Sequence, residues 1–315
     1  MNGRNYCAEY ATFAAALFAL SAFLLIGFGK TSAGASVSVS DSPACASIQP
    51  DLSLVATAAY AKDLTTGKVL YAKNADAQLP LASLTKLMTV ATAADVIAPE
   101  DTVTISRQAL APEGDAGFVI GERWTASALI GYTLLVSAND GAHAIALAAA
   151  EKEGSTPEGF IQRMNVKAAA LGMHESFFTS DTGLDISSTT AGAYGSARDI
   201  ATVLAYLVKN DPALVEGTRD GSKTFTSLSG IAHRGENTSD VIEGLPGAIA
   251  SKTGYTDLAG GNLAVVFEPM PGHAVAAVVL GSTRDGRNTD MQVLAEGAKK
   301  ALKRMLLCAD GAGSP

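Results

Sequence analysis

The order of strand-type and helical segments is the feature that most restricts the fold of this 315-residue chain. Two strand-type runs, LVATAAYAKD and KVLYAKN, flank a hairpin turn at residues 65–67. A long helical stretch follows, strand-type runs return within residues 247–282, and an amphipathic helix comes last. Strands on both sides of a helical stretch predict an α+β fold, in which one antiparallel sheet packs against helices and a helical subdomain is inserted.

The helical stretch is defined by apolar residues that recur with helical spacing. After Ser83, one helical face carries Leu84, Leu87, Met88, Ala91 and Ala94. Further helices are predicted within residues 124–136, 139–153, 157–173 and 196–210. Gly172 closes the third of these in the manner of a helix C-terminus.

Composition restricts the class of protein and its partners. Hydrophobic residues make up 48% of the chain and charged residues 17%, as in globular proteins rather than disordered ones. The formal net charge is -8, and no basic patch is present, which argues against a nucleic acid partner. We expect a globular domain at 53–307, preceded by a linker at 36–52 and followed by a flexible tail at 308–315.

The N-terminal segment predicts export. Residues 11–29 carry no charge, Arg4 precedes them and Lys30 follows. Residues 1–35 therefore have the form of a signal peptide, with an A-x-A cleavage site at residues 33–35. The apolar run is also long enough to span a bilayer as a retained signal anchor. Both alternatives place the globular domain outside the cytoplasm, and the second attaches it to the membrane.

Cysteine and histidine positions argue against a metal site. Cys7, Cys45 and Cys308 show no metal-binding spacing. In an oxidising compartment Cys45 and Cys308 either form a disulfide or stay free, and the sequence leaves both open. We interpret the histidines as structural or surface residues, because none falls in a Ser-His-Asp pattern; these are His143, His174, His233 and His273. We interpret Asp140, Asp181 and Asp199 as helix-capping residues.

Ser83 and Lys86 form the first pattern with chemical potential, S-x-x-K at a helix start. Residues three apart lie on one helical face, so the lysine amine can reach the serine hydroxyl. A serine becomes a good nucleophile when a nearby base removes its proton, and a buried lysine with a lowered pKa is such a base. The alternative is an N-cap serine beside a solvated lysine.

Ser137 and Asn139 form a second pattern, S-x-N, between two helical segments. A hydroxyl at this position can pass a proton to a leaving group, and an amide can hold a lysine and a substrate carbonyl. Ordinary helix capping is the alternative.

Lys252, Thr253 and Gly254 form a third pattern, K-T-G, at the end of a strand-type run. The small glycine lets an extended substrate lie against the strand edge, and the other two side chains can bind a terminal carboxylate. A turn after a strand is the alternative.

Together, S-x-x-K, S-x-N and K-T-G in this order resemble the penicillin-binding proteins and serine β-lactamases. The flanking stretches PLASLTKLMT, LLVSANDGAHAIA, FIQRMNVKAAALGM, SARDIA and SKTGYTDLAGGNLAVV are similar to the low-molecular-weight D-alanyl-D-alanine carboxypeptidases. The resemblance extends over residues 54–305. It implies a sheet of about five strands and an active site between the sheet and the helical subdomain.

The resemblance also implies catalytic roles. Ser83 attacks the carbonyl of the penultimate D-Ala, and Lys86 is its general base. Ser137 passes a proton to the departing D-Ala with help from Lys252, and Asn139 orients Lys86 and the substrate amide. No cofactor or metal is required.

Further residues are implied in substrate binding. The oxyanion hole is formed by the backbone N–H groups of the nucleophile and of Tyr255. Thr253 contacts the substrate carboxylate beside Gly254, and Arg287 and Arg234 help to neutralise it. The implied partners are peptidoglycan muropeptides as substrates and β-lactams as covalent inhibitors.

Three other functions remain open from the sequence. A D,D-endopeptidase that cuts peptidoglycan cross-links shares the acyl chemistry and differs in the leaving group. A serine β-lactamase needs fast deacylation, but no E-x-x-L-N pattern lies between Ser137 and Lys252. A non-catalytic penicillin-binding sensor is the third. We expect no β-rich domain after the last helix, although many members of the family carry one.

Overall fold

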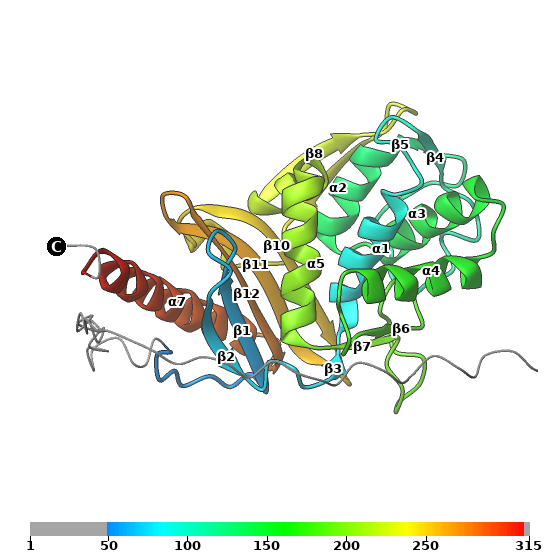
Figure 1. Cartoon of the computed structure of the whole chain (residues 1–315). Helices are drawn as coiled ribbons and strands as arrows, with labels where there is room; N and C mark the ends of the chain where they lie inside the picture. Colours follow the sequence, from blue (N-terminus) through cyan, green and yellow to red (C-terminus); the bar gives the residue numbers. More distant parts are fainter. Residues whose placement is uncertain (1–48, 312–315) are drawn as a thin grey trace, which may run out of the picture. The chain divides into compact units, whose positions relative to one another are not determined.

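A five-stranded antiparallel sheet in the order β10-β11-β12-β1-β2 is the centre of the fold (Figure 1). The computed structural model describes residues 49–311, so the predicted signal segment and two of the cysteines lie outside the described residues. The strands are β1 (Ala58–Asp63), β2 (Val69–Lys73), β10 (Ala248–Thr256), β11 (Gly260–Met270) and β12 (His273–Ser282). β1 pairs with β12, so the first hairpin joins the last three strands, as predicted.

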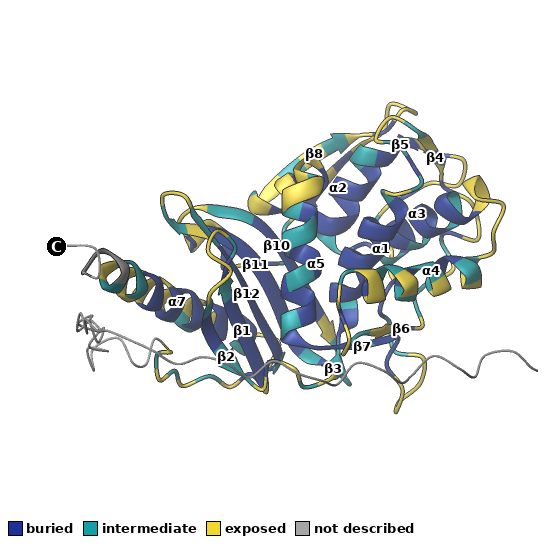
Figure 2. Cartoon of the chain, viewed as in Figure 1, coloured by how far each residue is buried: buried dark blue, intermediate teal, exposed yellow. Residues whose placement is uncertain are grey.

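The sheet buries both of its faces because side chains alternate along each strand. On β12, Val278 belongs to one hydrophobic cluster and Val279 to the other. Helix α5 (Ala197–Asn210) contributes to the first cluster and helix α7 (Gly286–Gly311) to the second. Most residues of β1, β11 and β12 are buried (Figure 2).

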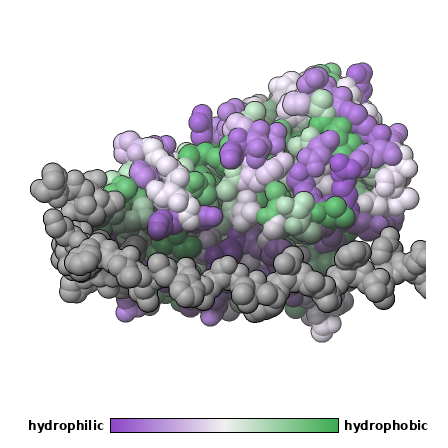
Figure 3. All heavy atoms as spheres, in the orientation of Figure 1, coloured by the Kyte–Doolittle hydropathy of each residue, from purple (hydrophilic) through white to green (hydrophobic). Residues whose placement is uncertain are grey.

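The helical subdomain lies between the early and late strands in sequence, and the predicted α+β architecture is confirmed. It contains α1 (Thr85–Ala93), α2 (Ala126–Val136), α3 (Asn139–Lys152) and α4 (Pro157–Ala170). Side-chain hydroxyls cap three of the helices: Thr125 caps α2, Thr156 caps α4 and Ser196 caps α5. On the face shown in Figure 3, hydrophilic side chains are spread over this subdomain and surround smaller hydrophobic patches.

Helix α1 differs from the expectation of a single buried face, because each of its residues is buried (Figure 2). Its polar side chains find acceptors within the protein. Thr85 Oγ1 donates to the Ala82 carbonyl at 2.7 Å, and Thr89 Oγ1 donates to the Asp181 carbonyl at 2.6 Å. Burial on all sides fixes this helix, and with it Lys86, in the centre of the subdomain.

The remaining elements are short. The strands are β3 (Leu79–Pro80), β4 (Thr102–Thr104), β5 (Arg123–Thr125), β6 (Phe177–Phe178), β7 (Ala193–Gly195), β8 (Ser222–Thr226) and β9 (Ala232–Glu236). The helical turns are η2 (Ala82–Leu84), α6 (Pro212–Val215), η3 (Glu216–Arg219) and η4 (Ile242–Gly244). Within residues 49–311, no helix has the length and apolar character needed to cross a membrane. Helix α7 extends to Gly311, into the segment expected to be a tail, and Cys308 near its end is disulfide-bonded.

Replacing Leu294 tests the contribution of α7 to the core. Leu294 has no exposed surface, so Leu294→Ala leaves a cavity and should lower the free energy of unfolding by about 2–5 kcal/mol. Leu307→Ala on the same helix is the matched control, because that side chain is 63% exposed, and the change should stay within about 0.5 kcal/mol. Urea unfolding measures both. Equal losses in the two variants would contradict this description of the core.

Candidate active site

Ser83 lies in the η2 turn (Ala82–Leu84) directly before α1. The preceding residue, Ala82, has a left-handed backbone conformation (φ 48°) that residues other than glycine rarely adopt. Asn262 on β11 donates from Nδ2 to the carbonyls of Pro80 and Leu81 at 3.0 and 3.1 Å. The turn that carries Ser83 is therefore tied to the central sheet.

Lys86 meets Ser83 across the first turn of α1. Lys86 Nζ lies 2.8 Å from Ser83 Oγ, 2.7 Å from Asn139 Oδ1 and 2.9 Å from the Thr182 carbonyl. The lysine has no exposed surface. Its amine is therefore enclosed by acceptors from the η2 turn, α3 and the loop after β6.

Burial changes the protonation of Lys86. Removal from water disfavours the ammonium form and lowers the pKa of Lys86 to about 7, although the charges of Asp181 and Asp140 oppose the shift. A lysine with this pKa is partly neutral at physiological pH. Its neutral amine is a base within reach of the Ser83 hydroxyl.

Ser137 and Lys252 form a second serine–lysine contact, which joins the end of α2 to β10. Ser137 ends α2 in a left-handed conformation (φ 62°), and its Oγ accepts a hydrogen bond from Lys252 Nζ at 2.7 Å. Lys252 also donates to the Thr253 carbonyl at 2.8 Å. Burial, and then the charges of Lys86 and Arg287, lower the pKa of Lys252 well below its usual value.

Gly254 allows β10 to pass close to the Ser83 turn. A Cβ atom at this position would lie 2.9 Å from the Leu81 carbonyl oxygen and 3.3 Å from the backbone nitrogen of Ser83. The next residue, Tyr255, exposes 42% of its surface, and the Arg284 guanidinium lies 5.2 Å from its ring centroid. The backbone of β10 thus borders Ser83, as the oxyanion-hole hypothesis requires.

Arg287 lines the same cleft as Ser83 and contacts β10. It donates from Nη1 to the Gly254 carbonyl at 3.0 Å and from Nη2 to the Thr238 carbonyl at 3.3 Å. Thr238 Oγ1 in turn lies 2.5 Å from Thr253 Oγ1. Burial lowers the pKa of Arg287, with a further contribution from Arg284.

Arg234, in contrast, does not join the site. Its side chain on β9 is 70% exposed and pairs with Glu236 at 2.9 Å. β9 forms a hairpin with β8, and along this strand only alternate residues are buried, so the arginine points to solvent. The prediction that Arg234 neutralises a substrate carboxylate is not supported by this position.

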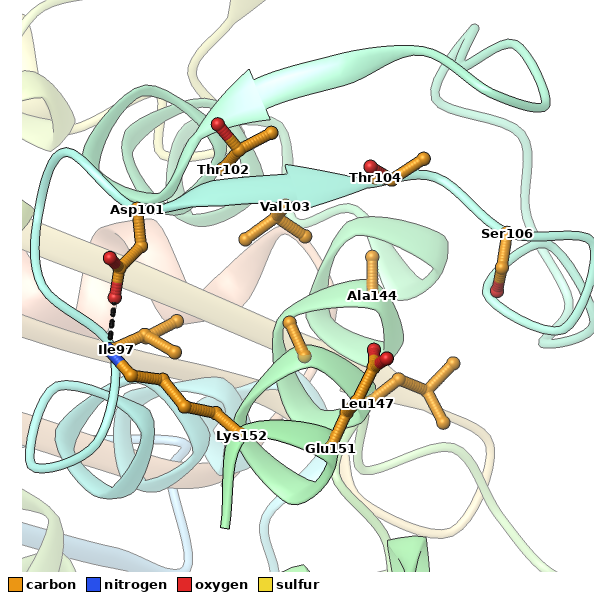
Figure 4. Close-up of a pocket in the computed structure, with 11 residues that line it drawn as sticks. Ile97, Asp101, Thr102, Val103, Thr104, Ser106, Ala144, Leu147, Glu151 and Lys152 are labelled. Carbon is orange, nitrogen blue, oxygen red and sulfur yellow. Dashed lines mark hydrogen bonds and ion pairs between the residues drawn. The ribbon is translucent and has the colours of Figure 1, made fainter. Parts of the chain in front are cut away.

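The cleft has a volume of about 380 Å3. It is lined by Ser83, Ser137, Thr238, Asp240, Thr253, Gly254, Tyr255, Arg284, Asp285 and Arg287. A separate cavity of about 410 Å3 lies between β4 and α3, where Asp101 and Lys152 form an ion pair at 2.5 Å (Figure 4). That cavity contains none of the predicted catalytic residues, so the cleft at Ser83 is the stronger candidate.

Sequence reasoning missed several residues of the site, including Thr182 and Asn262. Thr182 acts through its backbone carbonyl, which has no signature of its own. The following Gly183 has a φ of 80°, and a Cβ there would lie 2.0 Å from the Ala82 carbonyl oxygen, so glycine is needed for this loop to pass the Ser83 turn. Asp181 pairs with His143 rather than capping a helix. Among the described residues, no group of His, Cys, Asp and Glu is arranged to hold a metal.

Comparison with known proteins agrees with this geometry. The family model for D-alanyl-D-alanine carboxypeptidase matches residues 44–284. The chain belongs to this family. It is 31% identical to carboxypeptidase DacF of Bacillus subtilis over 232 residues, covering 72% of this chain and 57% of that protein. It is also 31% identical to DacA of Escherichia coli over 74% of this chain and 58% of that protein. The chain thus spans somewhat more than half the length of these relatives.

Two further comparisons bear on fold and on reaction type. Penicillin-binding protein D2 of Listeria monocytogenes, solved with ampicillin bound, aligns with a TM-score of 0.67 and 28% identity over 79% of this chain and 99% of that chain. A D-alanyl-D-alanine endopeptidase of Pseudomonas aeruginosa is 29% identical over 66% of this chain and 65% of that protein. The predicted penicillin-binding fold is confirmed.

Gly254→Ala tests the close approach of β10 to the Ser83 turn. The added methyl group has to displace the Leu81 carbonyl, and misplacement by about 1 Å should slow acylation by a fluorescent penicillin by about a hundredfold. Gly244→Ala is the matched control, because a Cβ there meets no atom within 4 Å. Labelling rates and far-UV circular dichroism are measured for both. Normal labelling of Gly254→Ala would show that the contact is not needed.

Proposed function

We propose that this chain is a serine peptidase that removes the terminal D-Ala from muropeptides ending in D-Ala-D-Ala, through an acyl-enzyme on Ser83. The observation that carries the proposal is the 2.8 Å contact between Ser83 Oγ and Lys86 Nζ, because the lysine is buried and its pKa is lowered to about 7. Membership of the D-alanyl-D-alanine carboxypeptidase family supports the same conclusion.

In the acylation step, neutral Lys86 takes the Ser83 proton as the oxygen attacks the carbonyl carbon of the penultimate D-Ala. Asn139 Oδ1 and the Thr182 carbonyl accept from the resulting ammonium, so the new charge is formed among existing acceptors. The backbone N–H groups of Ser83 and Tyr255 stabilise the negative oxygen of the tetrahedral intermediate.

Collapse of the intermediate breaks the peptide bond. Ser137 gives its hydroxyl proton to the departing amine of D-Ala. It takes a proton in return from Lys252, whose Nζ lies 2.7 Å from Ser137 Oγ. Water then attacks the acyl-enzyme, and the released peptide ends in a single D-Ala. Thr253 and Arg287 bind the carboxylate of the leaving D-Ala, beside the strand backbone at Gly254.

The partners follow from this chemistry, and the location follows from the N-terminal segment. The substrates are peptidoglycan muropeptides, and β-lactams acylate Ser83 because they mimic the D-Ala-D-Ala end. The penicillin-binding protein of Listeria with bound ampicillin supports this step. The enzyme acts outside the cytoplasm in peptidoglycan maturation, exported by residues 1–35 and associated with the membrane when residues 11–29 are retained.

A D,D-endopeptidase is the second candidate, and the relative of that name in Pseudomonas favours it. The acyl part of the reaction is the same in both enzymes. A cross-linked substrate differs by a larger leaving group, which has to fit the cleft beside Arg284 and Asp285.

Release of D-alanine tests the proposal. Residues 36–315 should release free D-alanine from a soluble peptide ending in D-Ala-D-Ala, and Ser83→Ala should abolish release because it removes the hydroxyl that is hydrogen-bonded to Lys86. Ser106→Ala, an exposed serine in the cavity of Figure 4, is the control and should keep full activity. D-alanine release by Ser83→Ala would overturn the proposal. Cleavage of cross-linked dimers alone would identify the endopeptidase.

The lowered pKa of Lys86 predicts a pH dependence. The reactive form is the neutral amine, so acylation by penicillin should slow about tenfold per pH unit below pH 7 and level off above it. Lys86→Arg should not be labelled at any pH between 5 and 9, roughly, because arginine stays protonated. A labelling rate that does not change across this range would exclude Lys86 as the base. The measurement is stopped-flow labelling in matched ionic strength.

A further inference from the structure

His143 and Asp181 form a buried pair close to Lys86. His143 Nδ1 lies 2.6 Å from Asp181 Oδ2, and the two side chains are only 17% and 9% exposed. An ionised carboxylate can only accept, so the imidazole Nδ1 donates. His143 follows Asn139 by four residues on α3, which places both side chains on the same helical face. One face of α3 therefore contacts Lys86 directly and also holds Asp181.

The loop that contains Asp181 is attached to α1 through its backbone. The Asp181 carbonyl accepts from Thr89 Oγ1 at 2.6 Å, and the Thr182 carbonyl accepts from Lys86 Nζ at 2.9 Å. His143 holds the same loop from α3 through the carboxylate. The carbonyl that binds Lys86 is thus positioned by contacts with two helices.

Asp181 also acts on Lys86 through its charge. Three charged side chains interact electrostatically with Lys86: Asp181 from the loop, Asp140 from α3 and Lys252 from β10, on which Arg287 also acts. Asp140 is satisfied by backbone N–H groups of Ala116 and Gly141 at 3.0 and 2.9 Å. The Asp181 carboxylate instead contacts the His143 side chain, so its position beside Lys86 depends on His143.

We propose that His143 and Asp181 act as one positioning unit, which holds a negative charge beside Lys86 and thereby sets the lowest pH at which Ser83 is acylated. The inference rests on the proposed function of Ser83 and Lys86. Neither residue of the pair lines the cleft at Ser83. A negative charge stabilises the ammonium form of Lys86, so the pair raises the pH needed to produce the neutral amine.

The sign of the effect separates this role from simple structural support. Asp181→Asn removes the charge and keeps an acceptor for His143, so the acid limb of the acylation rate should move to lower pH by about one unit. His143→Leu removes the contact that holds the Asp181 carboxylate beside Lys86, and should move the limb in the same direction. His143→Asn returns an N–H donor at the position of Nδ1 and should restore the wild-type midpoint.

The experiment measures the pH midpoint of penicillin acylation for these variants and for the double variant Asp181→Asn/His143→Leu. If the pair acts as a unit, the double variant should have the midpoint of Asp181→Asn alone. His174→Gln, an exposed histidine, and Asp185→Asn, a carboxylate of the same loop, are controls that should keep the wild-type midpoint.

Three results would overturn the inference. The first is an unmoved midpoint in Asp181→Asn, even where the plateau rate falls. The second is an effect of His143→Leu that adds to that of Asp181→Asn. The third is an equal shift in the controls. A wild-type protein that penicillin never acylates would overturn the proposed function as well, whereas acylation with an unmoved midpoint overturns this inference alone.

Discussion

The burial of Lys86 is the constraint on which the rest of the site depends. An ammonium group taken out of water is costly unless hydrogen-bond acceptors surround it. Lys86 has three, and they come from the η2 turn, from α3 and from the loop after β6. These segments are distant in sequence, so the fold has to bring them together before the lysine can be buried. Helix α1, which carries Lys86, is itself buried on all sides.

A second buried lysine makes this arrangement more sensitive to charge. Lys252 lies on β10, and the charge of Lys86 contributes to the lowering of its pKa. Two neighbouring ammonium groups repel each other, which favours states in which at least one amine is neutral. The central sheet brings one lysine to the site and the helical subdomain brings the other. In the proposed mechanism, proton transfer from Ser83 to Lys86 and from Lys252 to Ser137 therefore depends on the contact between these two parts of the fold.

Much of this could be predicted from the sequence where the pattern reflects burial. The helices α2 to α5 follow regular apolar spacing, and the strands β10 to β12 are rich in small and β-branched residues. The β8–β9 hairpin was not predicted, because β8 (SKTFT) has no fully buried residue and little apolar character. The burial of the polar residues of α1 could not be predicted, because their acceptors, such as the Asp181 carbonyl, come from distant parts of the chain.

The site itself was predicted in part. Ser83, Lys86, Ser137, Asn139 and Lys252 carry distinctive side chains in short motifs. The structure joins them by hydrogen bonds in two groups, Lys86 with Ser83 and Asn139, and Lys252 with Ser137. Thr182 could not be predicted, since it contributes only a carbonyl. Arg234 was assigned to the site only through the family resemblance, and the alternating burial of β9 directs it to solvent.

The most direct test of this account is a measurement of the protonation of Lys86 itself. The 13Cε resonances of labelled lysines can be followed by NMR against pH, with Lys86→Arg identifying the signal. The account predicts a midpoint for Lys86 of about 7. A midpoint near 10.4, roughly the value for a lysine in water, would contradict the account, because Lys86 would then be an ammonium ion at physiological pH and could not remove the Ser83 proton.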